Sequence, residues 1–574
     1  MPAAPVAWQV FMASLVAKAN SLHVFSHDVT VLPKSHFTLT RLNSTEARGE
    51  DRAAARIFRD DSKRPLLFLL LAAAAYLYLN LFSLPAVPFL LGGDQVSFWL
   101  RGLRLLDHQR IYQDFYQFTP PGMDLVYFGL FRLLGTHVWV TNLFVLVLGV
   151  ALCGLTFSIA RQIANLQFAA LATAFFLVTI YCKLLNGTHH GLSVLCVMIA
   201  VRIGMKQTGA PGVLVAGVFL GCASFFTQTR GAAALAAFVL FLAWRQWGTK
   251  RSWPAVLKDD GLLVMGFAVG WLLLNAYFIA TAGFRLIWYF QVTHVRRYIV
   301  HAEGYLLGLP DPLTLHNLPR LAPYLLVYIL LVLVYPTALW LSWRIRRRSG
   351  VWEPVSLLAL VGFFLLMEVA SSPNWLRVYA VSLPGFILLA WILYSSKKLP
   401  RSTAAMLWLV LFCIAGWQTV SHYAQRRVVA ALPGGVVATT PETYTKLHWL
   451  MERTKPGDFL FEAAWPGVYL PLQLRNPSYL ETVLPFDGPP AEAVRRVPGE
   501  LESHKVQIVL WSRSLDATPG QTPSSDDYLP QLRRYLHDCY GRVYGFSDGE
   551  EAWQRIDRSG CAQERDGLAP GNTP

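Results

Sequence analysis

The chain of 574 residues is 54% hydrophobic and only 15% charged, and its mean hydropathy is +0.38. Soluble globular proteins carry about a quarter charged residues, and disordered chains lack the 13% aromatic content found here, so both classes are excluded. The net charge of +15 would suggest nucleic acid in a soluble protein, whereas in a membrane protein it is typical of cytoplasmic loops. The composition predicts a multi-pass protein of the lipid bilayer that does not bind nucleic acid.

Residues 1–64 are predicted to be a poorly ordered cytoplasmic extension, because the apolar stretch at 6–16 lacks the basic residues that open a signal peptide. Eleven apolar segments of roughly membrane-spanning length follow. They are 65–90, 138–160, 166–183, 190–205, 211–228, 231–247, 261–281, 322–343, 353–371, 376–395 and 403–420. Lys and Arg gather in every second joint between them, so the N-terminus is predicted to be cytoplasmic and the C-terminal region to lie outside.

The predicted domains are therefore the extension 1–64, a transmembrane domain 65–421 and an extracytoplasmic domain 422–574. Beyond residue 422, helical patterns alternate with short β-rich runs such as 506–511, which indicates a small α/β domain. Cys539 and Cys561 would lie in an oxidising space there and could form a disulfide.

The first external loop, residues 91–137, is the most informative stretch. Asp94 comes directly after the first predicted span, and the residues after it have the helical spacing of an amphipathic helix lying along the external surface. Arg101 and Arg104 fall away from the centre of its apolar face. Asp114 is a second acid in this loop. An alternative role for Asp94 is that of a simple helix N-cap.

These motifs resemble the GT-C superfamily of membrane glycosyltransferases, and most closely its branch of protein O-mannosyltransferases and lipid A aminoarabinose transferases, as in glycosyltransferase family 39. The matches are Asp94, the Tyr-Gln-Asp-Phe run 112–115, the Pro-Pro-Gly turn 120–122, the segment 221–231 and the segment 374–384. The resemblance covers residues 65–400. With the eleven apolar segments, the predicted fold is a polytopic α-helical membrane protein of about eleven transmembrane helices, similar to GT-C proteins. The resemblance implies transfer of a sugar from a polyprenyl-phosphate donor, with inversion at the anomeric carbon.

The chemistry of this reaction requires a base for the acceptor hydroxyl and cations for the departing phosphate. We predict Asp94 as the general base, with Asp114 as a second catalytic acid. The predicted phosphate-binding residues are Arg230, Arg296, Arg297 and Arg377, which lie on the side that the positive-inside rule disfavours. Possible substrate contacts are Gln95, Gln228, Tyr289, Tyr298, His189 and His190. The external arginines could alternatively bind ordinary lipid headgroups.

The sequence departs from the family pattern at two places. Gln95 follows Asp94 where many members have Glu, and the second external loop carries Asn186, His189 and His190 in place of an acid. No metal ligands are assigned, since adjacent histidines on a helix point in different directions, although a divalent metal remains possible. Glu368, near the outer end of its span, is expected to be paired or to line a cavity.

The favoured hypothesis is a glycosyltransferase of a bacterial plasma membrane, acting on a lipid, glycan or protein acceptor on the periplasmic side. A transporter or flippase of a lipid-linked or anionic substrate is the main alternative. Transporters, however, place ionisable residues near the middle of the membrane and often contain two related halves. A third possibility is an O-antigen ligase or polymerase, which would not need Asp94.

Overall fold

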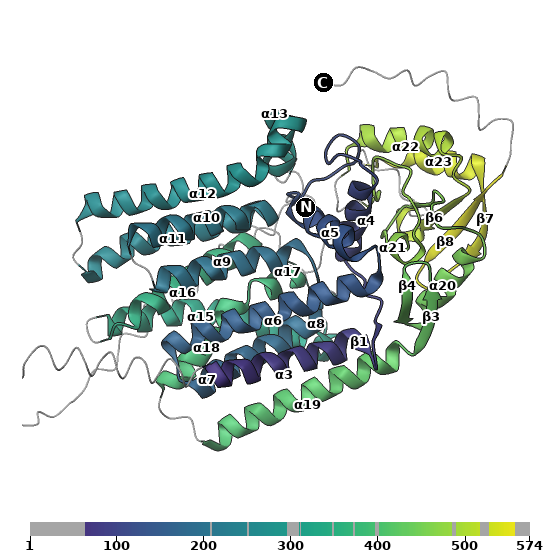
Figure 1. Cartoon of the computed structure of the whole chain (residues 1–574). Helices are drawn as coiled ribbons and strands as arrows, with labels where there is room; N and C mark the ends of the chain where they lie inside the picture. The colour runs from purple at the N-terminus through teal and green to yellow at the C-terminus, as the bar shows by residue number, and fades with distance from the viewer. Residues whose placement is uncertain are drawn as a thin grey trace, which may run out of the picture. The chain divides into compact units, whose positions relative to one another are not determined.

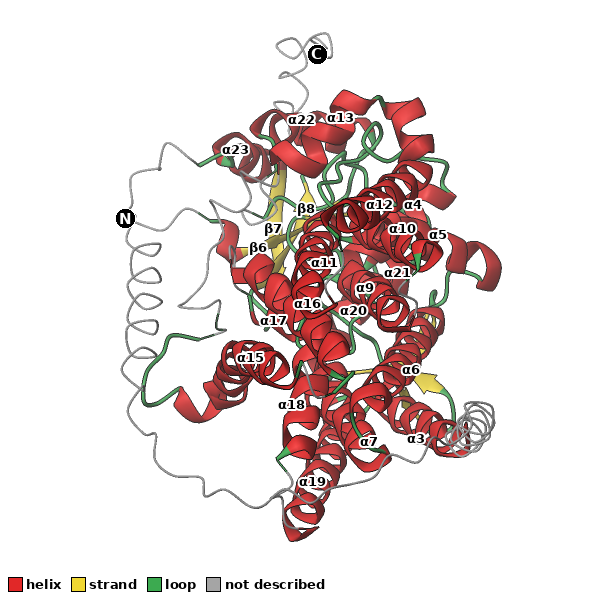
Figure 2. Cartoon of the chain, turned by 90° about the vertical axis from the view of Figure 1, so that its left-hand side faces the viewer, coloured by secondary structure: helices red, strands yellow, loops and turns green. Residues whose placement is uncertain are grey.

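The computed structural model describes residues 63–206, 209–249, 252–294, 309, 311–346, 349–370, 374–396, 401–484, 489–516 and 527–556. The chain divides into two compact units, Met1–Lys63 and Arg64–Pro574, and the second contains every described residue except Lys63. Within it, helices form a bundle and the strands gather at one end of that bundle (Figures 1 and 2).

The helices of the membrane region are α3 (Lys63–Leu81), α6 (Val138–Ile163), α7 (Leu166–Phe175), α8 (Cys182–Leu184), α9 (His189–Lys206), α10 (Ala210–Phe226), α11 (Gln228–Thr249), α12 (Trp253–Ala282), α13 (Phe284–Trp288), α15 (Leu318–Ile345), α16 (Trp352–Ala370), α17 (Trp375–Ala380), α18 (Leu383–Ser395) and α19 (Arg401–Gln425). Two π-helical stretches, η1 (Phe176–Tyr181) and η2 (Tyr289–Thr293), continue α7 and α13. The first long loop contains α4 (Gln95–Leu106) and α5 (Gly122–Leu134).

Every predicted span coincides with helix over most of its length. Seven helical segments of the described chain are long and apolar enough to cross a membrane, and Ala210–Phe226 and Leu383–Ser395 are apolar but shorter. The predicted first span ends too late, because residues 82–88 turn back as the short strands β1 (Phe82–Ser83) and β2 (Val87–Pro88). The prediction of a polytopic helical membrane protein is confirmed.

Helices α10 and α12 lie side by side and touch through glycines on both (Figure 1). A Cβ added to Gly217 or Gly221 would stand 2.2 or 2.3 Å from a backbone oxygen of α12. A Cβ on Gly266 or Gly270 would stand 2.2 or 2.5 Å from a backbone oxygen of α10. This small-xxx-small pattern on both helices allows the backbones to approach as membrane helices commonly do.

We expect Gly266→Ala to destabilise the bundle by about 1–3 kcal/mol, because the new methyl group must push the two helices apart. Gly261→Ala is the matched control on the same helix, since nothing lies within 4 Å of its Cβ position. Thermal stability of the purified protein in detergent measures both variants. Equal stability of the two would contradict the close packing.

The C-terminal region contains an antiparallel hairpin, β3 (Val428–Leu432) and β4 (Gly435–Thr439), and a mixed sheet in the order β5-β6-β8-β7. The strands of this sheet are β5 (Phe461–Glu462), β6 (Ile508–Ser512), β7 (Tyr540–Gly545) and β8 (Glu550–Arg555). The accompanying helices are α20 (Pro441–Met451), α21 (Tyr469–Leu472), α22 (Ala491–Ser503), the short 3₁₀ helix η5 (Arg513–Leu515) and α23 (Pro530–Cys539). The predicted α/β character is confirmed. Cys539 is disulfide-bonded, and its predicted partner Cys561 lies outside the described residues.

Helix α4 is amphipathic as predicted, but it does not lie bare on a surface. Arg101 and Arg104, predicted to fall away from the centre of the apolar face, are 3% and 6% exposed. The Nε of Arg101 donates to Oε2 of Glu481 at 2.9 Å. Helix α4 is therefore enclosed between the membrane helices and the C-terminal region.

Candidate active site

Asp94 stands at the N-cap position of α4, at the end of the helix bundle where the first loop begins. Its side chain makes no capping hydrogen bond, so the N-cap alternative does not account for it. Burial raises the pKa of the Asp94 carboxyl above its usual value, while the positive charge of Arg377 acts in the opposite direction. Asp94 therefore lies close to the guanidinium of a residue far away in the sequence.

Gln95, the next residue, is 1% exposed and joins two loops through its amide. Its Nε2 donates to the carbonyl of Gly92 at 2.9 Å and to that of Leu185 at 3.5 Å. Its Oε1 accepts from the backbone N–H of Gly187 at 3.0 Å. Both the oxygen and the nitrogen of the amide are therefore hydrogen-bonded to the backbone. They join the start of α4, where Asp94 lies, to the loop 185–187 that precedes His189.

Replacing Gln95 by Met should loosen this junction, because the buried N–H of Gly187 would lose its acceptor at a cost of about 1–3 kcal/mol. Amide hydrogen exchange at Gly187 should then be on the order of 5- to 150-fold faster. Gln113→Met is the control, since the amide of Gln113 makes an exposed hydrogen bond to the carbonyl of Thr281. Unchanged exchange at Gly187 would rule out the junction.

Arg230, in the first turn of α11, is completely buried. Its Nη1 lies 3.1 Å from Nδ1 of His190 and donates to Oγ of Ser193 at 2.9 Å. On its other side, Nη2 lies 3.8 Å from Oε2 of Glu368, whose Oε1 accepts a hydrogen bond from Thr229 at 2.5 Å. The expectation that Glu368 is paired is confirmed.

The charges of the site converge from several helices. Arg377 on α17 and Arg230 on α11 lie close enough to repel one another, and both act on His189 and His190 at the start of α9. The ring of His189 also packs against Phe98 of α4, with centroids 5.3 Å apart. The structure therefore brings Asp94, both histidines and two of the predicted phosphate-binding arginines together.

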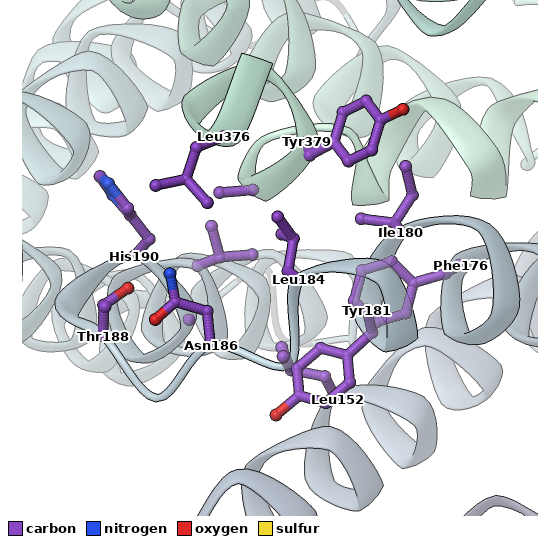
Figure 3. Close-up of a pocket in the computed structure, with 13 residues that line it drawn as sticks. Leu152, Phe176, Ile180, Tyr181, Leu184, Asn186, Thr188, His190, Leu376 and Tyr379 are labelled. Carbon is purple, nitrogen blue, oxygen red and sulfur yellow. The ribbon is translucent and has the colours of Figure 1, made fainter. Parts of the chain in front are cut away.

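An apolar pocket adjoins this cluster (Figure 3). It is small and lies between η1, α8, α9 and α17. Leu152, Phe176, Ile180 and Leu376 are among its apolar walls, and Asn186, Thr188 and His190 lie together at one end (Figure 3). The pocket thus has an apolar body whose polar end is formed by a histidine bound to Arg230.

The other predicted site residues are engaged elsewhere or fall outside the structure. Asp114 accepts from Arg110 at 3.0 Å, and this ion pair holds the pKa of Asp114 below its usual value. Gln228 donates to the carbonyl of Gln291 at 3.3 Å. Tyr289 packs against Phe290 in an aromatic cluster. The remaining predictions, Arg296, Arg297 and Tyr298, lie outside the described residues.

A buried group near α4 was not predicted. Asp124 on α5 is completely buried, accepts a hydrogen bond from Gln117 and lies 3.8 Å from Nη1 of Arg101. Burial raises the pKa of Asp124 to about 7, against the lowering effect of Arg101. A single carboxylate in an apolar helix is a weak signal for this group in the sequence, but nothing there reveals its partner.

Among the residues that the structure describes, no three His, Cys, Asp or Glu side chains are grouped as metal ligands would be. His190 faces Arg230, a cation that a bound metal ion would repel. The cluster combines the guanidinium groups of Arg230 and Arg377 with the carboxylates of Glu368 and Asp94.

The fold matches solved membrane glycosyltransferase structures. ArnT from Cupriavidus metallidurans bound to undecaprenyl phosphate matches with a TM-score of 0.52 and 13% identity, over 86% of this chain and 99% of that one. The apo state of the same ArnT matches with a TM-score of 0.53 and 12% identity, over 85% and 97%. The archaeal oligosaccharyltransferase AglB from Archaeoglobus fulgidus, in complex with an inhibitory peptide and a dolichol-phosphate, has a TM-score of 0.43 and 12% identity, over 86% and 74%.

No protein-family model matches the sequence, and no curated protein matches it significantly. The apolar helices and the structural likeness together identify the chain as an integral multi-pass membrane protein with a fold similar to that of ArnT. The resemblance found in the sequence motifs is confirmed at the level of the fold.

Proposed function

We propose that the protein transfers a sugar from a polyprenyl-phosphate donor to a hydroxyl group of an acceptor on the external side of the membrane. The observation that carries this proposal is the convergence of Asp94, Arg230 and Arg377 beside an apolar pocket. Arg230 is buried and Arg377 is partly buried, and the two positive charges act on one another. A phosphate bound between them would be stabilised by both guanidinium groups. A lipid phosphate supplies that anion together with an apolar chain.

In this mechanism the acceptor oxygen attacks the anomeric carbon of the donor sugar. The bond between that carbon and the phosphate oxygen breaks, and the polyprenyl phosphate leaves with the bonding electrons. Asp94 takes the proton of the acceptor hydroxyl, and Arg230 and Arg377 stabilise the charge that develops on the phosphate. Attack on the face opposite to the phosphate inverts the configuration.

In this proposal the apolar pocket binds the first isoprene units of the donor lipid, next to the phosphate. Asn186 and His190 lie at its polar end, and its other walls are largely aliphatic and aromatic (Figure 3). His190 lies 3.1 Å from Nη1 of Arg230 in the cluster. The first isoprene units would bury apolar surface there at about 25 cal/mol per Å². The charged residues stand at helix ends, as Arg230 and His190 do, whereas transporters place theirs near the middle of the membrane.

The test uses the full chain in proteoliposomes with a panel of polyprenyl-phosphate-linked hexoses and pentoses and an extract of envelope acceptors. We expect release of polyprenyl phosphate together with a glycosylated product. Movement of the intact donor across the bilayer without cleavage of the sugar–phosphate bond would instead establish a flippase.

The rate of transfer should depend on pH through Asp94. A protonated carboxyl cannot accept the proton of the hydroxyl group, so kcat/KM should fall as the pH falls through the pKa of Asp94. Because burial raises that pKa, the midpoint should lie above the usual carboxyl value of about 4. Arg377→Met should move the midpoint upward, since Arg377 lowers this pKa. A downward shift in a pH–rate profile would contradict this assignment.

A further inference from the structure

Two short hairpins stand where membrane helices end. Strands β1 and β2 follow α3 directly, and β3 begins three residues after the last residue of α19. The hairpins are joined, because the backbone N–H of Leu90 donates to the carbonyl of Ala438 at 2.9 Å. A third span meets them where the N–H of Val138, the first residue of α6, donates to the carbonyl of Gly434 at 3.1 Å.

The exposed surface of these hairpins is apolar. Leu84 is 61% exposed, Val429 59% and Val436 50%, and Ala431, the cross-strand partner of Val436, is exposed as well. The opposite face of the β3–β4 hairpin, with Leu432 and Val437, is buried in the protein. An antiparallel hairpin with one face in water normally alternates apolar and polar residues. This hairpin is apolar on both faces.

The depth of the hairpins relative to the membrane explains why their exposed surface is apolar. Helix α3 has 19 residues, so it is about 28 Å long, close to the hydrocarbon thickness of about 30 Å. Tyr423 of α19 donates to the carbonyl of Phe82, which sets the end of α19 at the same level as the end of α3. The hairpins therefore begin at the boundary between hydrocarbon and headgroups. The exposed Arg427 beside Val428 is suited to lipid phosphate at this depth.

We propose that Leu84, Val429, Ala431 and Val436 form an apolar rim that is immersed in the lipid leaflet on the side of the candidate site. The occupant of this surface is the bilayer itself, because the rim is continuous with three helices that enter the membrane. The C-terminal region would thus be anchored in lipid by its first hairpin, in addition to its covalent link to α19.

The test measures depth by electron paramagnetic resonance in nanodiscs and does not depend on the proposed activity. Nitroxide labels are placed at Val436→Cys and at Leu84→Cys in a Cys413→Ser background, which removes an exposed native thiol. Val543→Cys on β7 is the control, since Val543 is 47% exposed on a strand at the edge of the sheet. The collision ratio of O₂ to a nickel chelate should be at least about threefold higher at 436 and 84 than at 543, because O₂ partitions into apolar phases.

Equal ratios at all three positions would overturn the proposal. Protection of position 436 from both collision partners would also overturn it, because it would show a protein surface, such as a second copy of the chain, in place of lipid. The label at Leu84 keeps the test decisive if a label within the β3–β4 hairpin disturbs folding.

Discussion

Replacing Asp94 by Asn should lower the rate of sugar transfer by a factor of about 10²–10⁴, the usual contribution of a positioned general base. The amide of Asn has the size of the carboxyl group but cannot take the proton of the acceptor. The helix should remain intact, because the Asp94 side chain makes no capping hydrogen bond. Single-turnover transfer with a radiolabelled donor measures this loss without contributions from product release.

The matched control is Asp107→Asn at the opposite end of the same helix. Asp107 is the C-cap of α4, and its partly exposed carboxylate lies 3.3 Å from Nε of Arg475. An exposed pair of this kind is worth about 0–1 kcal/mol, so transfer should be unchanged. If Asp94→Asn inserts normally and transfers sugar at the rate of the unmodified protein, Asp94 is not the base.

Removing Glu481 should destabilise the protein by about 3 kcal/mol, toward the lower end of the range for breaking a buried ion pair. The side chains of Arg101 and Glu481 are 4% and 8% exposed and form a bidentate pair, so Glu481→Ala leaves a guanidinium buried without its main partner. Asp124, 3.8 Å away, compensates part of the loss. The melting temperature of the purified protein in detergent measures the effect.

A double-mutant cycle separates this pair from general damage. Arg101→Met combined with Glu481→Ala should cost less than the sum of the two single changes, because no unpaired charge remains. Arg475→Ala is the control for an exposed pair between the same two regions, and it should change stability by less than about 1 kcal/mol. Additive costs for Arg101 and Glu481 would show that the pair is not coupled.

The membrane helices could be predicted from the sequence because an apolar run of the necessary length is a local property. Even the helix interrupted between Ala380 and Leu383 lies within one predicted segment. The β3–β4 hairpin was not predicted, since its strands contain Val, Ala and Leu immediately after a span and lack the alternation of polar residues that marks a strand in water.

The candidate site was predicted only in part, for a different reason. The sequence predicts Asp94 as a general base and Arg230 and Arg377 as phosphate-binding residues, and the structure places these three side chains near one another. The other contacts around the candidate site join parts of the chain that are far apart in the sequence. The Arg101–Glu481 pair spans 380 residues, and the role of Gln95 depends on the carbonyl and N–H groups of another loop. No periodicity in a sequence carries such information.

The burial of Arg101 has a consequence for how this chain can be divided. Asp94 lies at the start of helix α4, and the buried Arg101 of the same helix is paired with Glu481 of the C-terminal region. Separating the membrane bundle from the C-terminal region would therefore expose Arg101 and remove its partner Glu481. Both regions belong to one compact unit of the chain. The candidate base lies at the start of α4, the helix that packs against both of them.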